Sequence, residues 1–261
     1  MTDYKIPKVW QESQADQENK MGNQPFAGSR FKQELPVGDA PLQVYSLGTP
    51  NGMKVTIMLE ELKEAGVREA QYDLYKINIG NGDQFGSDFV KINPNSKIPA
   101  MVDYSEKEPV RVFESVSILL YLAEKYKQFM PVSWAEKTEL MNWLFWQTGA
   151  APFVGGGFGH FFHAAPVAQE YPINRYTMET KRQLDLLDKH LVDKKYINGT
   201  EYSIADMANW PWYGRLVQDE VYEGAGEFLN VKEYKNLNAW AARIAERPAV
   251  KRAIDAEYKE I

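Results

Sequence analysis

The chain has 261 residues, enough for two domains of ordinary size, and its content of 44% hydrophobic and 13% aromatic residues excludes disordered and low-complexity proteins. Its 36 acidic and 30 basic side chains give a net charge of −6, which argues against nucleic acid or a membrane surface as a partner. It has no cysteine, so disulfide scaffolds, thiolate metal sites and a protein thiol nucleophile are excluded.

The N-terminal stretch 1–40 is polar, with scattered prolines and glycines and neither helix nor strand periodicity. It predicts an extended arm and has no signal- or transit-peptide pattern, so the expected location is the cytoplasm. Trp10, Phe26 and Phe31 are apolar side chains that could anchor the arm to another surface.

Residues 41–127 predict a compact α/β domain that begins with a strand at 42–47. The strand runs into the turn Gly48-Thr49-Pro50-Asn51-Gly52, whose Thr, Pro and Asn are typical of a helix start. The helix that follows ends at Gly66 and has apolar residues at spacings of three and four. Its apolar positions are Val55, Met58, Leu59 and Leu62, and the charged side chains expected to face outward are Glu60, Glu61 and Lys63.

A second strand is predicted at 72–79, and two more at 98–102 and 110–113 flank a polar turn. A helix that begins near Ser115 closes the unit. The order is therefore β-α-β followed by β-β-α, which is typical of an α/β layer structure.

Residues 128–261 predict an all-helical domain, because helical periods recur and no strand-like alternation stands out. Ser203 and Asp206 resemble a capping box, and Pro248 is expected to end the last long helix. The predicted helices cover 138–146, 174–191, 204–217 and 237–245.

The uncharged stretch 143–168 is long enough to cross a membrane. Prolines, glycines and histidines interrupt it, and no second hydrophobic segment of similar length accompanies it. We therefore expect buried helices joined at a Gly-rich bend.

Hydrolase and metal chemistry find little support in the sequence. There are three histidines and no G-x-S-x-G motif, so a Ser-His-Asp triad is not expected. His160 and His163 are three residues apart but lack the further ligands of a metal site, so no metal is expected. The glycine-rich segments 80–86 and 155–157 lack the phosphate-binding spacings.

The turn before the first helix could stabilise an anion. A helix N-terminus offers unpaired N–H groups and a partial positive charge, and Thr49 and Asn51 add polar donors beside it. The alternative is that one of these side chains only caps the helix, with Pro50 in its first turn.

Two further turns in the same domain could bind a peptide-like ligand. In the segment 93–99, Pro99 could hold a cis bond, Ile98 would present its backbone at a strand edge, and Lys97 could take a carboxylate or remain a solvated charge. Glu114-Ser115 precedes a helix and could grip the charged groups of an amino acid, or serve only as a cap.

Several motifs resemble the glutathione transferases, and among them the bacterial nu-class (YghU-like) disulfide-bond oxidoreductases. The N-P-x-x-K-I-P turn at 93–99 and the E-S pair at 114–115 match the family. Longer matching segments are YSLGTPNGMKVTIMLEEL, GDQF, FVKINPNSKIPA, VFESVSILLYLAEK, MNWLFWQTGAAPFVGGGFGHF, INRYTMETKRQLDLLD and ERPAVKR.

The resemblance implies a thioredoxin-like N-terminal domain (β-α-β-α-β-β-α), an all-α C-terminal domain and a homodimer. It also implies glutathione as co-substrate, with two glutathione molecules or one glutathione disulfide per active site, and reduction of small disulfides. Such proteins lack the residue that activates glutathione in other classes. The alternatives are a transferase or peroxidase that acts on electrophiles or hydroperoxides, and a glutathione-binding regulator without turnover.

The site residues that the resemblance implies fall into groups by the part of glutathione they serve. Thr49 and Asn51, on either side of Pro50, would bind the sulfur; Ile98 would pair with the cysteinyl part; Glu114 and Ser115 would bind the γ-glutamyl end; Gln84 and Lys97 would serve the glycyl end; Arg175 would reach the second glutathione; and Asn23 of the arm would touch ligand.

One position departs from the family pattern. Thr148 stands where relatives place a ligand-contacting Gln, and Gln147 comes one residue earlier. One residue along a helix turns a side chain by about 100 degrees, so either could serve the second glutathione. Trp143, Phe153, Phe161 and Tyr213 are candidates for the cleft wall or for the core.

Overall fold

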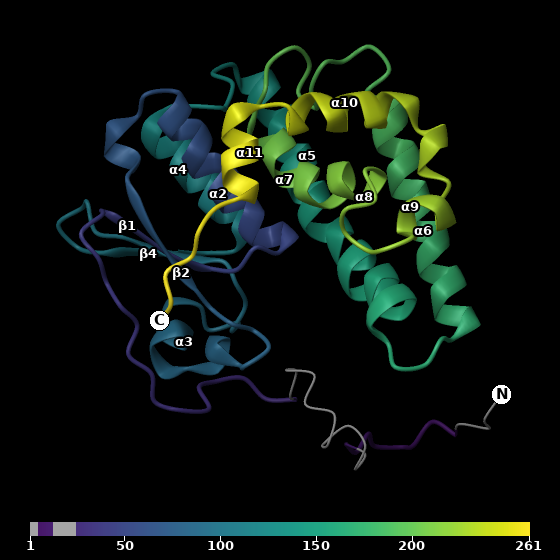
Figure 1. Ribbon diagram of the computed structural model, residues 1–261, viewed down its shortest axis with the longest axis horizontal. Helices are drawn as coiled ribbons and strands as arrows, with labels where there is room; N and C mark the ends of the chain where they lie inside the picture. The colour runs from purple at the N-terminus through teal and green to yellow at the C-terminus, as the bar shows by residue number, and fades with distance from the viewer. Residues whose placement is uncertain (1–4, 13–24) are drawn as a thin grey trace.

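The computed structural model describes residues 5–12 and 25–261. Figure 1 shows an α/β half and a helical half side by side, with the yellow C-terminal segment returning from the helical half to the sheet. Among the described residues, no helix combines the length and the apolar character that crossing a membrane requires.

The sheet has four strands in the order β2-β1-β3-β4. Strand β1 pairs in parallel with β2 and antiparallel with β3, and β3 pairs antiparallel with β4. The strands are β1 (Leu42–Ser46), β2 (Tyr72–Lys76), β3 (Ala100–Asp103) and β4 (Val110–Phe113).

Alternate residues of β1 bury against opposite faces of the sheet. Val44 belongs to the large core that includes α2 and α4, whereas Tyr45 belongs to a smaller core that includes Phe89 of α3. The helices of this half are α2 (Pro50–Glu64), α3 (Ser87–Ile92) and α4 (Ser115–Tyr126). The order β-α-β-α-β-β-α confirms the expected thioredoxin-like topology.

The third strand begins later than predicted. The peptide bond between Ile98 and Pro99 is cis, and β3 starts only at Ala100. Proline has no N–H to donate to a sheet ladder, which explains why the strand excludes it. The second predicted strand is also shorter than expected, since β2 ends at Lys76.

The other half is helical throughout, as the sequence predicts. Its α-helices are α5 (Trp134–Pro152), α6 (Glu170–His190), α7 (Ile204–Asn209), α8 (Arg215–Val217), α9 (Ala225–Phe228), α10 (Lys235–Ala245) and α11 (Pro248–Ile254). Two π-helical segments, Phe153–Ala164 and Trp210–Gly214, follow α5 and α7 directly.

The prediction of a Gly-rich bend within residues 143–168 is wrong. Helix α5 continues through Pro152 into the π-helical segment Phe153–Ala164. Proline lacks the N–H of the α-helical ladder, and the chain continues with the wider i→i+5 hydrogen bonds instead of turning.

Helix α10 ends at Ala245, shortly before Pro248, as predicted, and Pro248 begins a further helix, α11, that the sequence analysis did not predict. Helix α11 packs on α2 and covers the side that the sequence assigned to solvent. Glu60 and Glu61 are consequently 5% and 1% exposed. Glu60 pairs with Arg252 at 2.6 Å, and Glu61 pairs with Arg247 at 2.7 Å. These arginines, far away in the sequence, compensate the two negative charges and allow the glutamates to be buried.

The predicted capping box at the start of α7 is confirmed. The Ser203 hydroxyl accepts a bond from Ala205 N, and the Asp206 carboxylate accepts one from Ser203 N (3.0 Å). Asp206 also accepts bonds from Trp240 Nε1 (2.8 Å) and Ile197 N (2.9 Å). The cap therefore ties α7 to α10 and to the loop before it.

The C-terminal segment and residues 30–35 of the arm lie against the α/β half. Lys259 forms a parallel bridge with Tyr75 of the edge strand β2. In the arm, the Arg30 guanidinium lies 3.3 Å from the centre of the Phe85 ring. Two of the predicted anchors are largely exposed in this chain, Trp10 at 59% and Phe26 at 66%.

Candidate functional site

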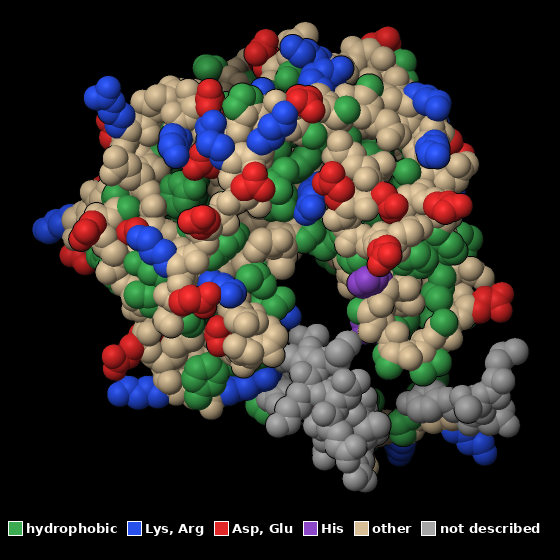
Figure 2. Space-filling view, in the orientation of Figure 1, with side chains coloured by type: hydrophobic (Ala, Val, Ile, Leu, Met, Phe, Trp, Pro, Cys, Tyr) green, Lys and Arg blue, Asp and Glu red, His purple; other side chains and the backbone are tan. Residues whose placement is uncertain are grey.

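A cleft of about 950 Å³ lies between the two halves. Figure 2 shows the molecule hollowed at this boundary. One wall comes from the starts of α2 and α4, and the other from α5, the π-helical segment after it and Trp212. Of the residues predicted for ligand binding, Asn51, Glu114, Ser115 and Thr148 line this cleft.

The N-terminus of α2 is built as the sequence predicts. Thr49 is its N-cap, and its hydroxyl accepts a bond from Gly52 N (3.3 Å) while Pro50 takes the first helical position. A hydroxyl that accepts this bond keeps its own hydrogen free to donate. Capping and ligand binding are therefore compatible at Thr49.

Asn51 is oriented by an aromatic residue from the other half. Trp212 Nε1 donates to Asn51 Oδ1 at 2.9 Å. Because an indole N–H can only donate, the Asn51 carbonyl must face Trp212, and its NH₂ group is left for other partners. Gly155 permits this arrangement, since a Cβ there would lie 2.6 Å from the Trp212 ring.

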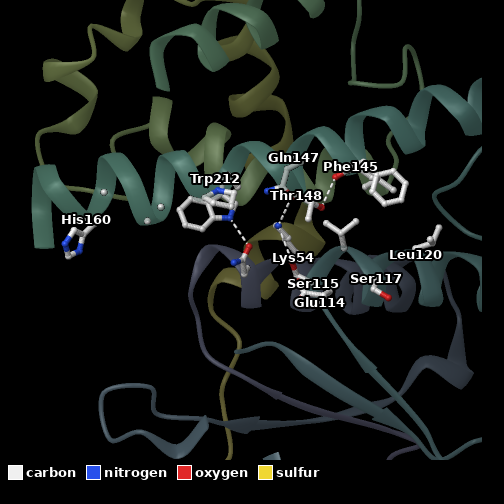
Figure 3. Close-up of a pocket in the computed structure, with 18 of the residues that line it drawn as sticks. Lys54, Glu114, Ser115, Ser117, Leu120, Phe145, Gln147, Thr148, His160 and Trp212 are labelled. Atoms are coloured by element: carbon white, nitrogen blue, oxygen red, sulfur yellow. Dashed lines mark hydrogen bonds between the residues drawn. The ribbon is translucent and has the colours of Figure 1, made fainter. Parts of the chain in front are cut away.

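Lys54 lies one turn further along α2, inside the protein. It is 2% exposed, and its Nζ donates to Ser115 Oγ (3.2 Å) and to Gln147 Oε1 (2.9 Å). Figure 3 shows it between the start of α4 and α5, with both bonds drawn. Burial lowers the pKa of Lys54 from 10.5 to about 7, and the Glu114 carboxylate opposes this shift.

The lowered pKa makes stability depend on pH. Between pH 7 and 10.5 the unfolded state binds more protons at Lys54 than the folded state, so the free energy of unfolding should rise with pH. The limit for one group is about 1.4 kcal/mol per pH unit. We expect urea denaturation of wild type and Lys54→Met to show a difference that grows in favour of wild type across this interval. Parallel profiles would contradict the prediction.

The start of α4 carries the acid and hydroxyl of the E-S pair. Glu114 is exposed and has the left-handed φ of 69°, which is strained for a residue with a side chain. Ser115 is buried, with its hydroxyl against Lys54. The Glu114 carboxylate thus lies next to the N-terminus of α4, whose partial positive charge is increased by the nearby Lys54 when its amine is protonated.

Gln147 and Thr148, at the position that departs from the family pattern, differ in their surroundings. Gln147 is fully buried, and its Nε2 has no hydrogen-bond partner among the described residues. Thr148 is exposed, and its hydroxyl donates back to Leu144 O (3.0 Å). Both line the cleft, but Gln147 is the one with an unused donor.

Gln84 and Lys97 lie outside the main cleft. Gln84 is buried, and its Oε1 has no partner in the described part of the chain. Lys97 is exposed and lines a smaller pocket of about 360 Å³ with Phe85 and the arm segment 25–28. Ile98 lies two residues before the β3 ladder, which begins at Ala100.

Further predicted residues are not placed at the cleft. Arg175 lies on α6 with an exposed side chain and is not among the cleft-lining residues, and Asn23 lies outside the described residues. Thr49, Pro50 and Ile98 are not among the cleft-lining residues either, although Thr49 and Pro50 form the start of α2 beside Asn51.

None of the four aromatic candidates for the wall lines the cleft. Tyr213 is fully buried in the core; the others are Trp143, Phe153 and Phe161. The wall uses Phe145, Trp212 and Tyr222 instead, and His160 lies beyond Trp212, away from Lys54. Sequence reasoning missed Trp212 and Lys54, because only tertiary contacts bring them to the site.

In the described ranges, no three His, Asp or Glu side chains are placed to hold a metal ion.

The two halves that enclose the cleft match two sequence patterns of one protein family. The pattern described as "Glutathione S-transferase, N-terminal domain" matches residues 40–124, and "Glutathione S-transferase, C-terminal domain" matches 170–243. The chain belongs to the glutathione S-transferase family.

Within the family, the chain is similar to the disulfide-bond oxidoreductase YghU of Escherichia coli, with 58% identity over 97% of this chain and 88% of the relative. It is also similar to the crystal structure of glutathione transferase YghU from Streptococcus pneumoniae complexed with glutathione, with 61% identity, a TM-score of 0.97 and coverage of 99% of both chains. A Pseudomonas putida glutathione transferase with one glutathione disulfide bound per subunit has 37% identity, a TM-score of 0.74 and coverage of 82% of this chain and 91% of the relative.

Proposed function

We propose that this protein reduces small disulfides with glutathione. The observation that carries the proposal is the combination of a helix N-terminus with free donors at Thr49 and Asn51 and a chain without cysteine. The attacking thiol must then come from the ligand. The similarity to an oxidoreductase of E. coli and to a relative that holds glutathione disulfide supports the same reaction.

Thr49 and Asn51 would act on the glutathione sulfur. Each has its acceptor atom engaged by the protein, Thr49 by Gly52 N and Asn51 by Trp212, and so each has a hydrogen to donate. Donors that favour the anion, together with the partial charge of the helix N-terminus, lower a thiol pKa and increase the thiolate fraction at neutral pH.

The remaining predicted contacts would hold the ends of the tripeptide. Glu114 and Ser115 would bind the γ-glutamyl group, the Ile98 backbone the cysteinyl part, and Gln84 and Lys97 the glycyl end. The buried Oε1 of Gln84, which has no partner among the described residues, can only accept, so it would take an N–H of the glycyl amide, and the Lys97 ammonium would take the carboxylate. Arg175 and Asn23 would contact a second glutathione from the helical half and the arm.

The reaction needs two glutathione molecules per disulfide. The first thiolate attacks one sulfur, breaks the S–S bond and releases one thiolate product, leaving a mixed disulfide. The second thiolate attacks the glutathione sulfur of that mixed disulfide, forms glutathione disulfide and releases the other product. The two thiol protons end on the two products, and the chain supplies orientation and electrostatic stabilisation.

The wider setting follows from the co-substrate and the family. We assign residues 41–127 to glutathione binding and 128–261 to the helical wall, preceded by the arm at 1–40. The family resemblance implies the nu class and a homodimer. A cytoplasmic location fits the reaction, because the cytosolic glutathione pool keeps disulfide exchange reductive.

Calorimetry and a coupled assay test the proposal. We expect two glutathione molecules, or one glutathione disulfide, to bind per subunit. We also expect turnover of hydroxyethyl disulfide to exceed conjugation of chlorodinitrobenzene and reduction of cumene hydroperoxide. Binding without turnover of any of the three would indicate a regulator, and faster conjugation would indicate a transferase.

A further inference from the structure

Lys54 connects the two walls of the cleft through a single nitrogen. Its Nζ lies 3.2 Å from Ser115 Oγ in the α/β half and 2.9 Å from Gln147 Oε1 in the helical half. All three side chains are less than a tenth exposed, and all three line the cleft. Lys54 is therefore a buried amine at the ligand cavity, with two neutral partners and no bonded carboxylate among the described residues.

The chemistry of an ammonium group fixes the orientation of both partners. When Lys54 is protonated, its ammonium group has three donors and no acceptor, so Ser115 and Gln147 must turn their oxygens toward it. The Ser115 hydroxyl hydrogen and the Gln147 NH₂ group then face other partners. Gln147 Nε2 has none in the described part of the chain, although it is buried and its side chain lines the cleft. A ligand acceptor would satisfy it.

We propose that Lys54 is a positioning residue that orients Ser115 and Gln147 as donors toward the α-carboxylate of the γ-glutamyl group and supplies the positive charge behind them. This inference rests on the proposed glutathione chemistry and adds to it. Glu114, beside Ser115, is left for the α-ammonium group. The arrangement also assigns Gln147, and not Thr148, as the ligand-binding residue of α5, because the Thr148 hydroxyl hydrogen is bound to Leu144 O.

The charges around Lys54 favour proton uptake when an anion binds. The carboxylate that raises the pKa of Lys54 is that of Glu114, at the start of α4. Gln147 of α5 and Trp212 of the π-helical segment are neutral, and the arginines at and before α11 pair with Glu60 and Glu61 farther along α2. A ligand carboxylate near Lys54 favours its charged form, so binding and protonation are linked.

The test measures protons taken up when S-methylglutathione binds, because this probe has both carboxylates but no ionisable thiol. Calorimetry in buffers of different ionisation enthalpy, one unit above the Lys54 pKa of about 7, should show wild type taking up as much as about one proton per subunit when the probe binds. Lys54→Met should lose this uptake and should bind about 10-fold more weakly or worse. His160 is another titratable group on the cleft wall, and the variant separates its contribution.

Matched variants separate position from charge. Lys63→Met makes the same change on an exposed part of α2 and should behave as wild type. Gln147→Met should weaken binding but retain proton uptake, because Lys54 remains. If Lys54→Met does not fold, the proton uptake of wild type and the affinity of Gln147→Met still test the inference.

Three results would overturn the inference. They are wild-type binding without proton uptake, unchanged uptake and affinity in folded Lys54→Met, and unchanged affinity in Gln147→Met. Failure of wild type to bind the probe would contradict the proposed function itself. Normal probe binding with proton uptake but no disulfide turnover would leave this inference intact and reject only the reaction.

Discussion

Thr49→Val should lower kcat/KM for disulfide reduction by about 100-fold, which is the usual effect of removing one donor that stabilises a developing anion. Valine keeps the branched shape of threonine but cannot donate to a sulfur. The pKa of the bound glutathione thiol should rise as well, and an ultraviolet titration of thiolate absorbance in the complex measures this rise. We expect both effects because the Thr49 hydroxyl hydrogen is not used by the helix cap.

Loss of the cap is a separate and smaller effect. It should cost about 1 kcal/mol of stability, measurable by urea denaturation. Thr49→Ser retains the hydroxyl and should retain most of the activity. A Thr49→Val protein with wild-type turnover and an unchanged thiol pKa would place the thiolate site elsewhere, with Asn51 the next residue to examine.

Arg247→Met should lower the free energy of unfolding by about 3 kcal/mol, because it leaves the Glu61 carboxylate buried without its partner. Glu61 is 1% exposed and accepts two bonds from Arg247, one of them 2.7 Å long. The Arg247 guanidinium also lies 3.9 Å from the centre of the Tyr202 ring, a cation–π contact that is lost as well. Denaturation in urea measures the loss.

Two comparisons make this result specific. Lys251→Met removes a cation from the same helix, but its partner Glu246 is exposed, so the cost should stay below about 0.5 kcal/mol. The double variant Glu61→Leu/Arg247→Met removes both charges and should recover much of the lost stability. An Arg247→Met protein as stable as wild type would show that solvent reaches Glu61 and screens it.

The sequence of strands along the chain and the turns of the α/β half were predictable because local patterns determine them. Strand β4 occupies the predicted residues, and the Thr49-Pro50 start of α2 follows from cap and first-turn preferences that act within a few residues. The capping box of α7 is equally local. At the site, this locality was enough to indicate Thr49 and the Glu114-Ser115 pair, whose ligand roles stay predictions.

The errors in predicted exposure concern α2, which is surrounded by other elements. A helical period with charges on one side predicts one solvent face, but α4, α7 and α11 leave α2 with little contact with water. The partners that make Glu61 and Glu60 tolerable lie 186 and 192 residues away in the chain. Lys54 was missed for the same reason, since its partner Gln147 is 93 residues distant.

The return of Lys259 to strand β2 gives the C-terminal segment a protective role. Its N–H and C=O bond to Leu74 O and Lys76 N of an edge strand that would otherwise present unpaired backbone to neighbouring molecules. Open edges of this kind are templates for aggregation. Because the covering residues follow directly on α11, loosening of the helical half would uncover the sheet, and the two halves should resist misassembly only while they remain docked to each other.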